Sequence, residues 1–228
     1  MANIVAYPTV GTTISISPWL DNTWSNPTFI YADDGSVASV TAASYDQVDQ
    51  TFVLEAKGFD FSSISASATI SGVIFTANIL GSGSGVSIDL AQLLDTSAAL
   101  AGTNKFITRS LLDTGSTSVK TAGGSADTWG NSLTVSWIQN SNFGVGIGCY
   151  AELNNAKVYV DYITLDVYYT IPPLNITPTP ISVIGSKVDP TVLIEGGGVT
   201  VTPSPLTAVG SKVDPIVVLG SLVITPSV

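Results

Sequence analysis

The chain lacks histidine, has a single cysteine and carries few charged side chains. Its 228 residues hold seven Lys and Arg against 17 Asp and Glu, which gives a formal net charge of −10. The absence of histidine excludes Ser-His-Asp and Cys-His catalysis, the commonest general base and nearly all zinc sites. We therefore predict a protein that is not an enzyme, and we assign no catalytic, cofactor-binding or metal-binding residues to it.

Basic segments and long apolar segments are also missing. The acidic balance repels phosphate backbones and anionic lipid surfaces, so neither nucleic acid nor a membrane is an expected partner. No apolar run approaches the length of a membrane span, and residues 1–18 lack the basic start and apolar core of a signal peptide. No GxxxxGK(S/T) phosphate-binding loop occurs. We expect a protein that is made in a cytoplasm and assembled there.

Two segments have the clearest strand patterns. Lys157–Thr170 alternates with apolar side chains on both faces, which predicts a strand in the middle of a sheet or between two layers. Ile70–Leu80 has one apolar face, which predicts a core strand. The two faces of the first segment are Val158, Val160 and Tyr162, and Ile163, Leu165 and Val167. The core face of the second is Val73, Phe75, Ala77 and Ile79.

Shorter strands and turns fill the rest of residues 1–170. Strands are expected at Thr12–Ser17, Val37–Ala42, Thr51–Ala56, Leu133–Trp137 and Phe143–Ala151. Turn residues cluster at Asp33–Gly35, Gly115-Ser116 and Ala122–Ser125. Ile88–Leu100 is either the one sizeable helix or a strand followed by a loop. Many short strands without strand–helix alternation predict an all-β fold, an antiparallel β-sandwich or jelly roll.

The last quarter of the chain repeats itself. The hexamer GSKVDP begins at Gly185 and again at Gly210, 25 residues later, and a further copy of the repeat begins at Thr225. We expect an arm of β-hairpins, with turns at Glu195–Gly198 and Gly220-Ser221. Two full repeats and the start of a third cannot bury a hydrophobic core of their own, so the arm is expected to dock on a partner surface. The predicted organisation is an N-terminal segment (1–18), a sandwich domain (19–170) and this arm (171–228).

A succession of short motifs in residues 20–170 resembles a known β-sandwich domain. The motifs are Trp24–Pro27, Tyr31–Gly35, Gly58–Phe61, Ala68–Val73, Asp127–Gly130, Ser141–Val145, Val160–Ile163 and Tyr168-Tyr169. Their order resembles that of a domain common in structural proteins of tailed bacteriophages and in some bacterial surface proteins. The valine-rich tail with its GSKVDP repeats is likewise similar to tails on phage virion proteins.

This resemblance implies a virion building block with no catalytic residues. The implied role is a head decoration or cement protein that contacts the major capsid protein or other virion proteins. A homo-oligomer is implied as well, with a trimer favoured. The alternative is a receptor-binding module, a phage fibre or bacterial adhesin whose sandwich binds a surface glycan.

A few carboxylates and the cysteine are candidates for chemistry. Asp33-Asp34 and Asp46/Asp49 are the nearest approaches to a carboxylate pair, although Asp-Asp-Gly is ordinary turn chemistry and adjacent strand residues point to opposite faces. Asp33-Asp34 with backbone carbonyls is also a candidate calcium site, against the alternative of a solvated turn. Cys149 lies in an apolar run and is expected to be a buried structural thiol.

Aromatic side chains are the candidates for binding a glycan, because rings stack on the apolar faces of sugars. Trp129, in the loop-like sequence ADTWGNS, is the best single candidate. The alternative for all of them is packing in the core and at its rim. The full set is Trp19, Trp24, Trp129, Trp137, Tyr159, Tyr162, Tyr168 and Tyr169.

Overall fold

A computed structural model describes residues 1–16, 22–41, 49–83, 85–151, 155–176 and 199–201. Contacts between residues divide the chain into two compact units. The first, which we call the body, is Met1–Ile171, and the second, which we call the tail, is Pro172–Val228. The expected N-terminal segment contributes strands to both sheets of the body, so it is part of the sandwich.

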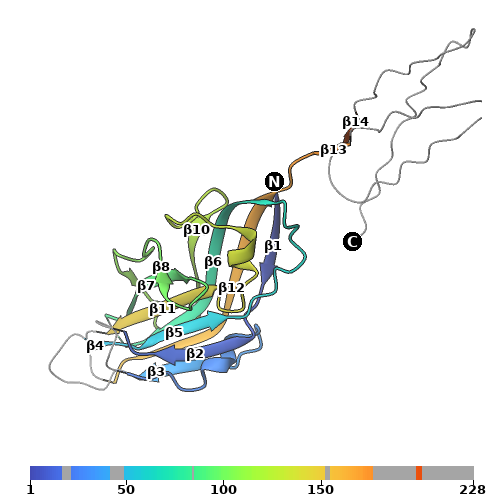
Figure 1. Ribbon diagram of the computed structural model, residues 1–228. Coiled ribbons are helices and arrows are strands. Elements are labelled where there is room, and N and C mark those ends of the chain that lie inside the picture. The colour runs from blue at the N-terminus through green and yellow to red at the C-terminus, as the bar shows by residue number, and fades with distance from the viewer. Residues whose placement is uncertain (17–21, 42–48, 84, 152–154, 177–198, 202–228) are drawn as a thin grey trace, which may run out of the picture. The chain divides into compact units, whose positions relative to one another are not determined.

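The body consists of two antiparallel sheets packed face to face (Figure 1). The first sheet has the order β1-β12-β6-β10, and β3 also pairs with β12. Its strands are β1 (Ala2–Ala6), β12 (Lys157–Thr170), β6 (Thr69–Ser82), β10 (Ser118–Gly124) and β3 (Ala38–Thr41). The predicted all-β sandwich is therefore confirmed.

The second sheet has the order β2-β5-β11-β7-β8, with β4 on β11 and β9 on β7. Its strands are β2 (Val10–Ile14), β5 (Val53–Lys57), β11 (Gly144–Ala151), β7 (Ser87–Leu94), β8 (Leu100–Ala101), β4 (Asp49–Gln50) and β9 (Ser110–Leu111). The described helices are the short 3-10 helix η1 (Pro27–Ile30) and α1 (Val135–Ile138). Ile88–Leu100 thus forms a strand and a loop, the second of the two predicted alternatives.

One apolar core fills the space between the sheets. The predicted core face of β6 is fully buried there, and β5 and β11 supply the opposite wall. The buried residues of these strands are Val73, Phe75, Ala77, Ile79, Leu54, Ala56, Val145 and Ile147. Burying alternate residues of each strand in this way is what gives an antiparallel sandwich its stability.

The strand β12 departs from the predicted pattern at Asp161. Val160 pairs with Ile79 and Tyr162 with Asn78, so Asp161 is an extra residue, a β-bulge that shifts the alternation by one. Both predicted faces therefore turn their aliphatic residues inward, and Tyr162 is only half-buried on the outside. The assignment of these residues to two faces was wrong for this reason, but the predicted position in the middle of a sheet is confirmed, since β12 lies between β1 and β6. The inward residues are Val158, Val160, Ile163, Leu165 and Val167.

Two shorter predictions also fail. Leu133–Trp137, predicted as a strand, instead leads into the helix α1, whose start is capped by Thr134. The Thr134 hydroxyl accepts a hydrogen bond from the Trp137 N–H at 3.2 Å, the usual use of threonine before a helix. Ala122–Ser125, predicted as a turn, continues β10 through Gly124. Local turn propensity is outweighed there by pairing with β6.

The tail contains one described strand pair. β13 (Leu174–Ile176) and β14 (Val199–Val201) run parallel, with Leu174 opposite Val199 and Ile176 opposite Val201. Paired residues are 25 positions apart, which is also the spacing of the two GSKVDP copies. This pair is not one of the predicted hairpins. The hairpin turns lie outside the described residues, so those hairpins stay a prediction.

Candidate functional site

The Asp33–Gly35 turn closes onto the bulge of β12. Asp33 and Asp34 are exposed, and the Asp34 carboxylate accepts a hydrogen bond from the Ser36 N–H at 2.8 Å. The Gly35 N–H donates to the Asp161 carboxylate at 3.1 Å, and Gly35 has the positive φ of 78° that favours glycine. These contacts are those of a structural turn. No group of three or more His, Cys, Asp or Glu side chains within the described ranges is placed to hold a metal ion.

The remaining carboxylate candidates, Asp46 and Asp49, lie only in part within the described residues. Asp46 lies outside the described residues, and Asp49 lies on β4 of the second sheet, whereas the Asp33–Gly35 turn bonds to β12 of the first sheet. The carboxylate that the structure does place at the Asp33–Gly35 turn is that of Asp161, which accepts the Gly35 N–H.

Cys149 is fully buried in the core, as predicted. Burial raises the pKa of its thiol well above the ordinary value of 9.0, and the nearby charge of Asp89 raises it further. A thiol in this setting stays protonated and is a poor nucleophile.

Trp129, the leading sugar-stacking candidate, is fully buried. Its indole N–H donates to the Val73 carbonyl at 2.9 Å, and the Lys105 ammonium lies 5.5 Å from the centre of its ring. Of the two interpretations of Trp129, packing in the core is confirmed and a face for a glycan is not, because the ADTWGNS loop folds inward against β6. Trp24 is buried too, and its indole N–H donates to the Phe52 carbonyl at 2.7 Å.

The other aromatic candidates differ in exposure. Trp137 is half-buried, as are the four tyrosines of β12, which are Tyr159, Tyr162, Tyr168 and Tyr169. Tyr162 packs edge-on against Tyr7, with ring centres 6.1 Å apart. Trp19 lies outside the described residues. Trp137 is thus the described tryptophan with an accessible surface.

One cluster of charged and aromatic groups was not predicted. The Arg109 guanidinium lies 3.3 Å from the ring centre of Tyr150, and its Nε lies 3.8 Å from the buried carboxylate of Asp89. Arg109 and Asp89 are 20 positions apart, and the strand β9 brings them together by pairing with β7. Only the pairing register of these strands, which the sequence does not specify, would have indicated the cluster.

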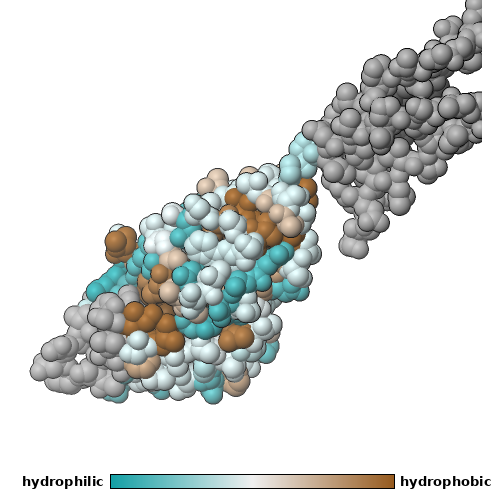
Figure 2. Space-filling model, viewed as in Figure 1, coloured by the Kyte–Doolittle hydropathy of each residue, from teal (hydrophilic) through white to brown (hydrophobic). Residues whose placement is uncertain are grey.

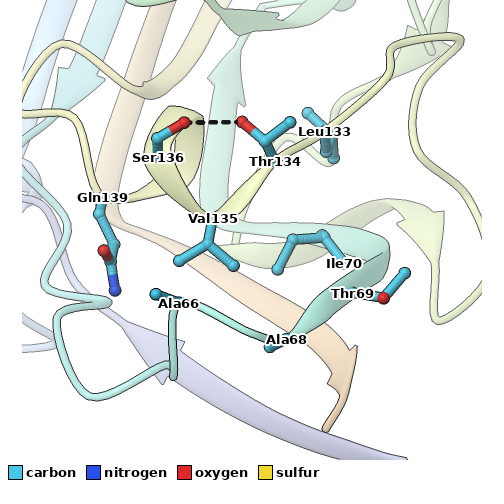
Figure 3. Close-up of a pocket in the computed structure, with 9 residues that line it drawn as sticks. All are labelled: Ala66, Ala68, Thr69, Ile70, Leu133, Thr134, Val135, Ser136 and Gln139. Atoms are coloured by element: carbon cyan, nitrogen blue, oxygen red, sulfur yellow. Dashed lines mark hydrogen bonds between the residues drawn. The ribbon is translucent and has the colours of Figure 1, made fainter. Parts of the chain in front are cut away.

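Two hollows flank the helix α1 at one end of the sandwich. The first has a volume of about 430 Å³ and lies between α1 and the start of β6. Figure 3 shows Val135 pointing into this hollow, toward Ile70. Thr134 and Ser136, which also line the hollow, are joined by a hydrogen bond of 3.0 Å. The second has a volume of about 310 Å³ and shares Thr134 and Ser136 with the first.

The wall of the first hollow is held by Gln139. Its side-chain amide donates to the carbonyl oxygens of Phe61, Ser62 and Ile64 at 3.1, 3.4 and 2.8 Å. These bonds fasten the loop before β6 to the end of α1. The lining is otherwise of alanine, threonine, serine and aliphatic residues, with no charged group among the residues that line it. The serine and threonine hydroxyls of this lining have no His, Lys, Asp or Glu among the lining residues to act as a base.

The second hollow differs from the first in having a charged residue and a tryptophan in its lining. Asp95, Thr96, Thr134, Ser136 and Trp137 line it. A carboxylate, three hydroxyls and an indole are the groups with which proteins bind small uncharged polar ligands. Sequence inspection had included Trp137 among the aromatic candidates but had missed Asp95, because the two are 42 positions apart.

Comparison with family models, with curated proteins and with solved structures gave no match for this chain. Among the described residues, no helix is long and apolar enough to cross a membrane.

Proposed function

We propose that this chain is a non-enzymatic structural protein of a phage virion, a capsid decoration or cement protein. In this proposal the acidic body faces outward, and the tail docks on the major capsid protein, on other virion proteins or on sister subunits. The resemblance of the motifs between Trp24 and Tyr169 to phage structural domains supports the virion role. A homo-oligomer, with a trimer favoured, is part of the same proposal.

The observation that carries the proposal is the β13–β14 pair. Its partners are offset by 25 residues, the repeat spacing, so equivalent positions of successive repeats lie side by side. The three-residue sequence before Thr177-Pro178 pairs with the one before Thr202-Pro203. A repeat whose copies pair with one another is a strand-adding element, and a strand with a free edge can also pair with a neighbouring chain.

The body supports a structural role through the uses of its distinctive side chains. Trp24, Trp129 and Cys149 are buried in the core, and Asp33-Asp34 form a turn. On the face drawn in Figure 2, the apolar surface of the body is divided into separate patches among polar ones. A stable docking surface usually needs a larger continuous apolar area. The proposal therefore assigns attachment to the tail, whose sequence is mostly Val, Ile, Leu, Thr, Pro, Gly and Ser.

Removal of the tail tests the proposal. The chain without residues 172–228 is expected to keep the circular dichroism spectrum and unfolding transition of the body but to lose co-sedimentation with the particle. The chain without residues 202–228 is the graded control, since it keeps the β13–β14 pair and should retain part of the binding. Equal co-sedimentation of the intact and the truncated chain would contradict the proposal.

A second candidate function is that of a receptor-binding module, a fibre or adhesin domain that binds a surface glycan. Trp137 favours it, because its half-buried indole lines a hollow with a carboxylate and hydroxyls. This function makes no use of the tail, so the truncated chain would keep it.

A further inference from the structure

We propose that the hollow beside Trp137 binds one ring of a neutral saccharide. The hollow of about 310 Å³ is lined by Asp95, Thr96, Thr134, Ser136 and Trp137. The site lies wholly within the body, so it stands whether or not the tail attaches the protein to a particle. It places glycan binding at Trp137 instead of Trp129.

The indole of Trp137 is fixed in orientation. Its Nε1–H donates to the Leu94 carbonyl at 3.2 Å, and its backbone N–H donates to the Thr134 hydroxyl at 3.2 Å. The first bond holds the ring to the end of β7, and the second holds the backbone of Trp137 to the start of α1. Since it is only half-buried, part of the ring remains accessible. A fixed aromatic surface loses little conformational entropy when the apolar face of a sugar packs on it.

The wall that carries Asp95 is fixed as well. One carboxylate oxygen of Asp95 accepts the N–H groups of Ser97 at 2.7 Å and Ala99 at 3.0 Å. Between them Ala98 has a φ of 62°, a strained conformation for alanine that these bonds maintain. The Thr96 carbonyl accepts a hydrogen bond from Asn142 at 2.9 Å, which ties the turn to the start of β11. The hollow is therefore formed before a ligand arrives.

The available groups fit hydroxyls better than charges. Asp95 Oδ1 already accepts two N–H groups, so its other carboxylate oxygen, Oδ2, is the acceptor for a ligand. Bonds from sugar hydroxyls to a charged acceptor are stronger than neutral ones. Thr134 and Ser136 hydroxyls lie 3.0 Å apart and can each donate or accept. None of the five lining residues is basic, and the net charge is −10. Phosphates, nucleotides and acidic sugars are therefore repelled.

A small organic cation is the competing ligand chemistry, because an indole and a carboxylate can also hold an ammonium group. Cation sites of that kind usually surround the ligand with several rings, whereas Trp137 is the one ring of this hollow. The three hydroxyl-bearing residues of the lining have no role with a quaternary ammonium. They favour the saccharide.

The test uses the full-length protein and a panel of neutral hexose and N-acetylhexosamine oligosaccharides. Binding is measured by saturation-transfer NMR and by tryptophan fluorescence. Binding is expected to quench or shift the emission, with that change lost in Trp137→Phe. Affinity is expected to fall by about tenfold in Trp137→Phe and by a few-fold in Ser136→Ala, the order of losing one stacking contact or one hydrogen bond. Ser136 is exposed, so its variant should fold normally.

Phe29→Ala is the matched control, because this ring is 43% exposed but lies on η1, away from the hollow. Its affinity should equal that of the unchanged protein. Choline is included as the cationic probe. The proposal would be overturned if choline bound and no hexose did, or if no sugar of the panel bound. It would also be overturned if the Trp137 and Ser136 variants bound the sugar as tightly as the unchanged protein.

Discussion

The indole N–H of Trp129 donates a hydrogen bond to the backbone carbonyl of Val73, 2.9 Å away in the buried interior. Trp129 has a φ of 58°, which is unusual for a bulky residue. Its backbone N–H donates a hydrogen bond to the Asp127 carboxylate at 2.8 Å. Gly123, with a φ of 87°, lies against the indole, where an added Cβ would collide with the Val73 carbonyl. The segment Asp127–Gly130 thus fastens the loop after β10 to β6.

Substitution of Trp129 should therefore cost stability and leave the fold class intact. Trp129→Phe keeps most of the packing but leaves the Val73 carbonyl without its donor, which costs about 1–3 kcal/mol of unfolding free energy. Trp129→Ala adds a cavity and should cost about 3–5 kcal/mol. Urea denaturation followed by circular dichroism measures both.

Trp137→Phe is the control for this comparison, since it removes a similar indole hydrogen bond at a half-buried position. Water can replace the lost donor there, so the cost should be smaller than for Trp129→Phe. Equal costs at the two positions would show that burial of the Val73 carbonyl is not what makes Trp129 important.

Much of the fold follows from alternating hydrophobicity, and the failures have identifiable causes. β6 and its core face were predicted because a single buried face leaves an alternating pattern. The phase of β12 was not, because the extra residue at Asp161 is set by pairing with Ile79 and Asn78 and has no local signal. Similarly, the burial of Trp129 depends on Val73, which lies 56 positions away.

The candidate site was only partly accessible to sequence reasoning. Trp137 was among the aromatic candidates, but its neighbours Asp95 and Thr96 come from the turn after β7. The segment around Trp137 was predicted as a strand, although Thr134 before it is an ordinary helix cap. Because this segment was predicted as a strand, the sequence analysis did not place Thr134 and Ser136 together beside the hollow.

The buried ion pair of β5 gives a second prediction. Glu55 is 2% exposed and accepts hydrogen bonds from Lys57 Nζ at 2.6 Å and from the Thr12 hydroxyl at 2.8 Å. Lys57→Met would leave the Glu55 charge buried without its cation, which costs about 3–5 kcal/mol. Thermal or urea unfolding at neutral pH measures the loss.

Two further variants identify the cause of that loss. Lys157→Met changes an exposed lysine at the start of β12 and should have little effect. Adding Glu55→Gln to Lys57→Met removes the unpaired charge and should recover most of the stability. If the double variant were no more stable than Lys57→Met, the loss would come from packing of the lysine side chain.

The acid stability of the body should depend on Asp127. Burial alone would raise the pKa of Asp127, but hydrogen bonds from Lys105 and the Trp129 N–H, with the charge of Lys105, hold the pKa below its ordinary 3.8. A carboxylate with a lowered pKa stabilises the folded state above its unfolded value, and the effect is lost as pH falls through the folded value. The unchanged protein should therefore exceed Asp127→Asn in melting temperature at pH 6, and the difference should shrink as the pH falls below the ordinary value of 3.8 and through the lowered folded value. In a Lys105→Met background the difference at pH 6 should shrink, because the Lys105 contribution is absent. A difference that persisted unchanged at low pH would assign the effect to side-chain shape rather than charge.

Reaction of Cys149 with a thiol reagent reports on opening of the core. The thiol is fully buried between the sheets, and both burial and the charge of Asp89 raise its pKa. In the folded protein it should not react measurably with an aromatic disulfide reagent at pH 8, because reaction needs both a thiolate and access. In denaturant, one equivalent should react, since the sequence holds one cysteine. At intermediate denaturant the rate should follow the unfolded fraction measured by circular dichroism.

Trp129→Ala, which removes the hydrogen bond to Val73 of β6, should raise the labelling rate in water by the same factor as it raises the unfolded population. Rapid labelling of the folded protein, with no change in the Trp129 variant, would mean that Cys149 is reached by a local opening that leaves the Trp129–Val73 contact in place.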